Sequence, residues 1–199
     1  MKKIKIKISD FKLVGERIIL RLLKISDARD IYLNIQDKKI AENILRIPWP
    51  YRLKDAQDFI KKTQKSFQKR TAFTFGIELK NKKEVIGCIT LDNVNFEHKK
   101  AEIGYWLGSK YRGQGITTEA GKLLLNFAFK KLKLHRIYGC AFGDNPASQK
   151  VFKKLGFKKE GFCRQANWRF GRWRDDILYG LLSKEFLKKQ SKFKNLWKN

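Results

Sequence analysis

Apolar residues between positions 53 and 69 recur in steps of three and four, which is the period of an amphipathic helix. Shorter apolar runs bounded by turn-forming or charged residues are typical of strands. These runs lie at residues 18–23, 72–79, 85–91, 101–107, 137–142, 161–166 and 176–182. Further helical patterns lie at residues 27–36, 117–132 and 145–155. The pattern therefore predicts strand, helix, helix, three strands, helix, strand, helix and two strands.

This order indicates a single α/β domain with a mixed sheet. The strand–helix–strand unit at residues 101–142 predicts one parallel strand pair joined by a right-handed crossover. No repeat or low-complexity linker divides the chain. At the start, lysine and isoleucine alternate over residues 2–8, which is typical of a half-exposed strand and lacks the unbroken apolar run of a signal peptide. The end, from Lys184 onward, is rich in lysine and predicts a loosely held helix or tail.

The charge balance adds a preference for anionic partners. The 199 residues carry 46 Lys and Arg against 19 Asp and Glu, a formal net charge of +27. Such a surface attracts cofactor phosphates, nucleic acid or a ribosome, although a lysine-rich composition alone would give the same number. Three well-separated cysteines and two histidines favour reduced thiols in a cytoplasmic protein without a metal site. No apolar run approaches the roughly 20 residues of a membrane span.

The segment after the strand at 101–107 carries the most informative chemistry. Gly113 and Gly115 fall just before a predicted helix, where glycine lets the backbone approach a ligand closely. The first N–H groups of that helix have no partner within it, and they favour a pyrophosphate. Lys110 and Arg112 add positive charge. The spacing matches neither a P-loop nor a dinucleotide-binding fingerprint, and a glycine turn that merely ends a strand remains the alternative.

Two motifs that follow one another along the chain favour a phosphate-binding loop over a simple glycine turn. The run from Arg112 to Thr117 resembles the R/Q-x-x-G-x-G/A motif of the Gcn5-related N-acetyltransferases (GNAT), and 145–157 resembles their N-x-x-S…LGF signature. More narrowly, the chain resembles the RimJ/RimL branch at residues 17–21, Pro50-Tyr51 and 176–181. The resemblance covers residues 16–187. It leaves 1–15 as a basic N-terminal extension and 188–199 as a lysine-rich tail. It implies a GNAT-type domain with a mostly antiparallel sheet and about four flanking helices.

The resemblance also implies a cofactor site for acetyl-CoA, used as the acetyl donor without a metal. The loop residues Arg112, Gly113, Gln114, Gly115, Ile116 and Thr117 would bind the pyrophosphate. The family has Gly or Ala where Thr117 stands, but the contacts of such a loop are mainly backbone N–H groups. The backbone of Tyr105, Trp106 and Leu107 would bind the acetyl carbonyl and the pantetheine arm, together with the amide of Asn145. Asn145 followed by proline is also a good helix start for purely local reasons.

Two side chains are candidates for catalysis. Glu102 lies on the predicted strand at 101–107, where a carboxylate would accept the proton of the amine; its alternative is a surface ion pair with a lysine. Many relatives place a tyrosine acid where Phe152 stands. Phe152 cannot donate a proton, and Ser148, one helical turn earlier, is the candidate donor to the CoA thiolate. Its alternative is an ordinary serine of a first helical turn.

The resemblance implies direct transfer of an acetyl group to a primary amine in a ternary complex, and members of the RimJ/RimL branch acetylate N-terminal amines of ribosomal proteins and various other amines. The first candidate acceptor is the N-terminal amine of a protein, with a ribosomal protein as partner and ribosome or RNA contact through the basic surface. One alternative is a small amine such as an antibiotic or polyamine. An alternative of another class is an RNA- or ribosome-binding module with an idle CoA site. The aromatic and arginine residues at 164–174 indicate either a nucleic-acid surface or a hairpin beside the acceptor groove. The sequence leaves monomer and homodimer open.

Overall fold

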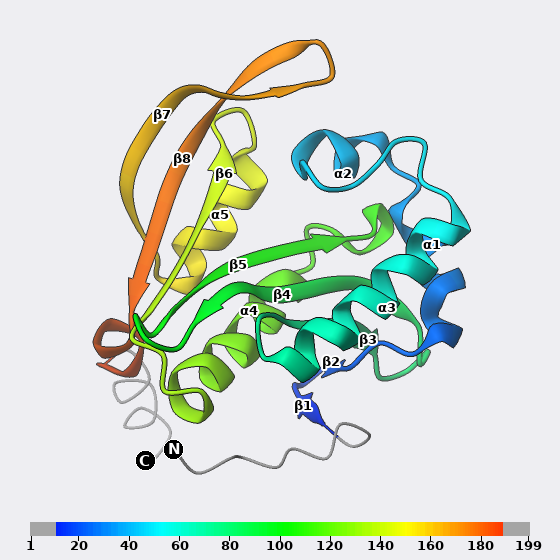
Figure 1. Cartoon of the computed structure of the whole chain (residues 1–199), viewed down its shortest axis with the longest axis horizontal. Helices are drawn as coiled ribbons and strands as arrows, with labels where there is room; N and C mark the ends of the chain where they lie inside the picture. Colours follow the sequence, from blue (N-terminus) through cyan, green and yellow to red (C-terminus); the bar gives the residue numbers. More distant parts are fainter. Residues whose placement is uncertain (1–10, 189–199) are drawn as a thin grey trace.

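A single mixed sheet of eight strands organises residues 11–188, the part of the chain that the computed structural model describes (Figure 1). The strand order is β1-β2-β3-β4-β5-β6-β8-β7. Every neighbouring pair is antiparallel except β5 and β6, which are parallel. The strands are β1 (Lys12–Val14), β2 (Ile18–Arg21), β3 (Phe73–Leu79), β4 (Val85–Asn95), β5 (Lys100–Leu107), β6 (Arg136–Phe142), β7 (Lys158–Arg169) and β8 (Arg172–Leu182).

Helices cover both faces of this sheet. The helices are α1 (Ala28–Ile35), α2 (Lys38–Asn43), α3 (Leu53–Lys69), α4 (Ile116–Asn126) and α5 (Pro146–Leu155). Helices α1 and α3 pack together on one face, around a core that includes Trp106 of β5, and Figure 1 shows both in front of the sheet. Helix α4 packs against α5 and the opposite face, where Ile103 and Leu107 belong to the larger core. We call these the α1/α3 face and the α4 face.

The one parallel pair among the described strands opens part-way along its length. Strands β5 and β6 are paired through three residues, ending at Glu102 opposite Tyr138. Beyond that point β5 continues to Leu107 and stays paired with β4, whereas β6 continues beside β8. The edge of β5 from residue 103 to 107 therefore has no strand partner on the β6 side in the described structure. Backbone N–H and C=O groups on an open edge are available to a ligand.

Most of the predicted elements are confirmed, including the parallel pair with its crossover and the amphipathic helix at 53–69. Two short elements were not predicted. Strand β1 has three residues and helix α2 has six, too few for a period to be recognised. The predicted helix at 117–132 is instead α4 followed by a wider π-helical turn over Phe127–Lys131. The predicted strand at residues 2–8 and the tail beyond residue 188 lie outside the described residues.

No helix in residues 11–188 is long and apolar enough to cross a bilayer.

Candidate active site

The glycine-containing loop has the geometry of an anion-binding site. Gly113 and Gly115 adopt φ angles of +77° and +78°, a left-handed conformation that side-chain-bearing residues rarely take. Gly115 is the N-cap of α4, and no side chain accepts a hydrogen bond from the first turn of this helix. The N–H groups of that turn are therefore left for a ligand. The structure brings together the loop residues Arg112, Gly113, Gln114, Gly115, Ile116 and Thr117 at one end of β5.

The loop is supported from behind by Arg17, in the turn between β1 and β2. The Arg17 guanidinium donates to the carbonyl of Gln114 (2.8 Å) and to Glu119 of α4 (2.9 Å), while its backbone N–H donates to the other oxygen of Glu119 (2.9 Å). Burial alone would raise the pKa of Glu119, but these hydrogen bonds outweigh it and lower the pKa. The sequence motif gave no sign of this support, because Arg17 lies about a hundred residues before the loop that it holds.

Arg112 connects the loop to the start of helix α2. Its Nη1 lies 2.9 Å from Asp37, and its Nε donates to the carbonyl of Leu107 (3.2 Å). Asp37 is the N-cap of α2, where it accepts from the N–H of Lys39. The guanidinium predicted to meet a cofactor phosphate therefore also anchors the start of α2.

On the α4 face, the side chain of Tyr105 is hydrogen-bonded to helix α5. The Tyr105 hydroxyl lies 2.8 Å from the Ser148 hydroxyl, and the side chain of Asn145 accepts from the N–H of Ser148 (3.1 Å). Burial raises the pKa of Tyr105, although the hydrogen bond with Ser148 acts in the opposite direction. Tyr105 is therefore a neutral donor at ordinary pH. The family resemblance implies a role for the backbone of Tyr105 alone, so its hydroxyl is a functional candidate that the sequence did not predict.

Phe152 belongs to the packing beneath this pair. It is 1% exposed and stacks on Tyr179 of β8 with ring centroids 4.6 Å apart. The side chain of Trp106 is also buried, on the α1/α3 face, and Leu107 is buried on the α4 face. Trp106 and Leu107 therefore offer a ligand their backbone rather than their side chains.

Glu102 lies on the opposite face of β5 from Tyr105, because strand side chains alternate. Its carboxylate accepts from the side chain of Asn93 (2.9 Å), a β4 residue at a bulge with φ of +49°. Desolvation, and then the charges of Glu102 and Asp92, raise the pKa of Tyr138 across the open pair. Asp92 is already paired with Arg46. Glu102 therefore lies beside the opening between β5 and β6 without an ion-pair partner in the described structure.

A second carboxylate, Asp176 of β8, lies on the same face as Glu102. Strand register aligns Asp176 with Phe142 of β6 and with Cys163 of β7. One oxygen accepts from Asn167 (2.8 Å), while the other is buried and has no hydrogen-bond partner within the described residues. Burial raises the pKa of Asp176, partly offset by Asn167 and by the charge of Arg174. Desolvation, then Asp176 and Glu102, also raise the pKa of the Cys140 thiol to about 11, so both carboxylates lie near it.

Hydrogen bonds join the β7–β8 hairpin to residues 41–47 beside this face, and we call these two segments together the arch. Arg169 donates to the carbonyl of Ala41 (2.7 Å), within α2, and to the carbonyl of Ile47 (2.5 Å), in the segment after α2. Arg174 is 5% exposed; it donates to the carbonyl of Glu42 (2.6 Å), pairs with Asp144, and stacks on Phe142 at 3.9 Å. Figure 1 shows the tip of the hairpin reaching toward α2. The aromatic and arginine cluster is thus part of a hairpin, as one of its two interpretations predicted.

Trp168 and Trp173 face each other across the hairpin with ring centroids 5.3 Å apart, and both are more than half exposed. No group of three or more His, Cys, Asp or Glu side chains converges as a metal site would in residues 11–188.

An open parallel pair, with a glycine loop of anion-binding geometry at one end and a carboxylate on the far face, is the arrangement expected of an acyl-CoA-binding α/β protein. A family model described as an acetyltransferase (GNAT) domain matches residues 17–158. The chain belongs to this family, and its enzymes use acetyl-CoA as the acetyl donor.

Individual relatives agree with this assignment. The chain is 35% identical over 100 residues to a protein named putative ribosomal N-acetyltransferase YdaF from Bacillus subtilis, covering 50% of this chain and 55% of that protein. It is 28% identical over 104 residues to spermidine N(1)-acetyltransferase from Escherichia coli, covering 52% and 56%. The match therefore spans about half the length of each of these two proteins. A solved structure, Mycobacterium smegmatis RimJ in complex with CoA-disulfide, is 25% identical with a TM-score of 0.80, covering 89% of this chain and 90% of that one.

Proposed function

We propose that this chain transfers the acetyl group of acetyl-CoA directly to a primary amine, and that its first candidate acceptor is the N-terminal amine of a protein such as a ribosomal protein. The observation that supports this most is the opening between β5 and β6, with donor groups at the loop and Glu102 on the other face. The thioester would lie across the opening, so that CoA approaches from the α4 face and the amine from the α1/α3 face. Residues 16–187 would form the catalytic domain.

Each group has one role in this proposal. The N–H groups of the 112–117 loop bind the pyrophosphate, and Arg112 adds a charge-assisted bond. The open edge of β5 from Tyr105 to Leu107, with Asn145, binds the amides of the pantetheine arm. An N–H group on that edge also stabilises the oxyanion that develops on the acetyl carbonyl.

Glu102 is the general base. An amine attacks only when neutral, and a carboxylate close to the opening removes the proton directly or through one water. The hydrogen bond from Asn93 fixes one oxygen of the carboxylate and leaves the other free for the acceptor. On the opposite face, the Tyr105–Ser148 pair supplies the hydrogen bond or proton that the CoA thiolate needs as it departs.

Gly115→Val tests the cofactor site. The new side chain would have to adopt a φ of +78° at the start of α4, which a β-branched residue strongly disfavours. We expect CoA affinity to fall by at least about tenfold, or about 1.4 kcal/mol, in calorimetric titrations. Gln114→Ala keeps the same backbone and should bind CoA nearly normally. Unchanged CoA binding by a folded Gly115→Val protein would remove the loop from the proposal.

Ser148→Ala and Tyr105→Phe test the leaving-group donor. Each removes one hydroxyl of the hydrogen-bonded pair without removing the ring or shortening the helix. We expect both variants to slow transfer from acetyl-CoA more than transfer from an acetyl thioester of a more acidic thiol, because the better leaving group needs less help. If Ser148→Ala slows both donors equally, Ser148 serves only the start of α5.

A cationic small amine is the second candidate acceptor, and a specific observation favours it. Although the chain carries +27 overall, Glu102 and Asp176 lie on the acceptor side without ion-pair partners in the described structure. The buried, unpartnered oxygen of Asp176 would be satisfied by an ammonium donor. A diamine or polyamine would place its reacting nitrogen at Glu102 and a second ammonium at Asp176.

Asp176→Asn separates the two acceptor classes. The amide keeps the size of the side chain and removes its charge. For a linear polyamine we expect kcat/KM to fall by about tenfold or more, since a hydrogen bond between charged groups contributes about 1.5–3 kcal/mol. For an N-terminal peptide without basic residues we expect little change. The assay uses acetyl-CoA with peptides, polyamines and aminoglycosides, read by product mass. If the peptides are acetylated and the polyamines are not, the second candidate is rejected.

A further inference from the structure

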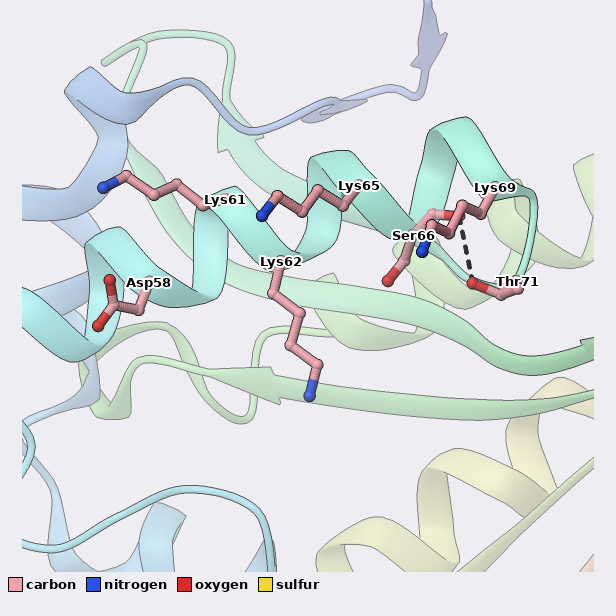
Figure 2. Close-up of a pocket in the computed structure, with 7 residues that line it drawn as sticks. All are labelled: Asp58, Lys61, Lys62, Lys65, Ser66, Lys69 and Thr71. Carbon is pink, nitrogen blue, oxygen red and sulfur yellow. Dashed lines mark hydrogen bonds between the residues drawn. The ribbon is translucent and has the colours of Figure 1, made fainter.

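The outward face of α3 carries a stripe of lysines remote from the proposed chemistry. Lys61, Lys65 and Lys69 follow one another at intervals of four residues, and Lys62 extends from an adjacent side of the helix (Figure 2). All four are exposed. Four residues advance a helix by about 6 Å, so the three aligned ammonium groups form a regular row of positive charge. We call Lys61, Lys65 and Lys69 the α3 stripe.

Neither acid of α3 forms an ion pair with the stripe, although the positive charge of Lys61, after the hydrogen bond and the charge of Lys54, helps to lower the pKa of Asp58. The two acids of α3 are engaged elsewhere: Asp55 caps the helix by accepting from the N–H of Arg52 (2.7 Å), and Asp58 pairs with Lys54 (2.7 Å). No ion pair involving the stripe is present in the described part of the chain. Like charges four residues apart destabilise a helix by about 0.2–0.5 kcal/mol per pair. Only Lys69, in the last turn, gains from the helix dipole. Helix stability therefore does not explain the stripe.

The surroundings of the stripe suit phosphate groups rather than lipid tails. The apolar residues Ala56, Ile60 and Phe67 of α3 are buried against the sheet, so the helix has no apolar face left to insert into a bilayer. A shallow depression beside the stripe is lined by four lysines, by two hydroxyl residues, Ser66 and Thr71, and at its other end by Asp58, whose carboxylate pairs with Lys54 (Figure 2). Lysines and hydroxyls are the groups that contact nucleic-acid phosphates.

We propose that the α3 stripe binds the phosphate backbone of RNA. The regular row of charge matches a polyanion with repeated phosphates, and it would contact the backbone without reading sequence. The binding does not depend on the acetyl-transfer proposal, because α3 contributes no group to the opening between β5 and β6. If both proposals hold, RNA contact would bring the enzyme to an acceptor on a ribosome.

The test replaces all three stripe lysines with glutamine (Lys61→Gln, Lys65→Gln, Lys69→Gln) in the full chain. The matched control replaces three exposed lysines on other elements (Lys82→Gln, Lys130→Gln, Lys153→Gln) and so removes the same charge. Affinity for a short fluorescein-labelled RNA duplex is measured by anisotropy over a salt series. Each phosphate contact contributes about 0.9 to the slope of log K against log salt, so the stripe variant should lose about 2–3 of that slope. The control should stay close to the parent.

Three results would overturn the proposal: no RNA binding by the parent chain, an equal loss of slope in the two variants, or binding to anionic phosphatidylserine vesicles that depends on the stripe while RNA binding does not. Circular dichroism establishes that both variants fold. Acetylation of a free acceptor, measured on the same samples, should be equal in all three proteins. A loss of acetylation would count against the acetyl-transfer proposal, whereas the RNA proposal is decided by the anisotropy measurements alone.

Discussion

Replacing Glu102 with glutamine is expected to lower kcat by about 10²- to 10⁴-fold, the usual contribution of a general base. The amide preserves the size of the side chain and its hydrogen bond with Asn93, but it cannot take a proton from the amine. CoA affinity should be unchanged, because Glu102 lies on the face of β5 opposite Tyr105 and Ser148. Steady-state kinetics and CoA titration on the same preparation measure both quantities.

The matched control is Glu97→Gln, the same chemical change at an exposed position in the turn between β4 and β5. It should leave kcat unchanged. If Glu102→Gln also keeps the wild-type kcat and pH–rate profile, then Glu102 only positions Asn93, and proton removal must occur through water alone.

Arg174→Ala is expected to lower the free energy of unfolding by about 2–4 kcal/mol, more than the other substitutions proposed for this chain. The substitution leaves a cavity against Phe142 and removes donors from the carbonyl of Glu42 and from Asp144. These contacts join β8 to α2 and to the loop before α5. The β7–β8 hairpin should therefore separate from α2 in the variant. Urea denaturation followed by circular dichroism measures the change.

Arg172→Ala is the control for this prediction. Arg172 also pairs with Asp144 (2.9 Å), but its side chain is 58% exposed. A surface ion pair contributes about 0–1 kcal/mol, so the loss should be within that range. Equal losses for the two variants would mean that the hairpin is held mainly by its strand pairing and that the buried contacts of Arg174 contribute little.

The sequence predicted the fold well where one period ran over many residues. Helix α3 begins and ends where its three- and four-residue spacing does, from Leu53 to Lys69. Short elements were not predicted. Helix α2 begins at the N-cap Asp37 and is held by three arginines that are remote in sequence, Arg112, Arg169 and Arg174. Such elements depend on tertiary contacts, which a local pattern does not contain.

The candidate site was predictable where a motif is contiguous and not where it is assembled from distant parts. The 112–117 loop could be located from its glycines, and their positive φ angles explain why glycine is needed there. The support from Arg17 and the pairing of the Tyr105 and Ser148 hydroxyls depend on how helices and strands pack. The net charge of the chain likewise did not predict a role for Asp176, because a count of charges does not show which carboxylates lie on the same face of a sheet.

The measurement that tests the central claim most directly is a rapidly quenched reaction of the chain with acetyl-CoA and an acceptor amine, with the amine and the intact protein weighed by mass spectrometry in the same sample. Direct transfer predicts an amine heavier by one acetyl group and a protein of unchanged mass at every time point. The raised pKa of Cys140 agrees with this, since the thiol stays protonated and is a poor nucleophile. An acetylated protein that forms and decays before the product would contradict direct transfer. CoA binding without any acetylated amine, across all acceptor classes, would contradict the enzymatic function and favour a binding module with an idle CoA site.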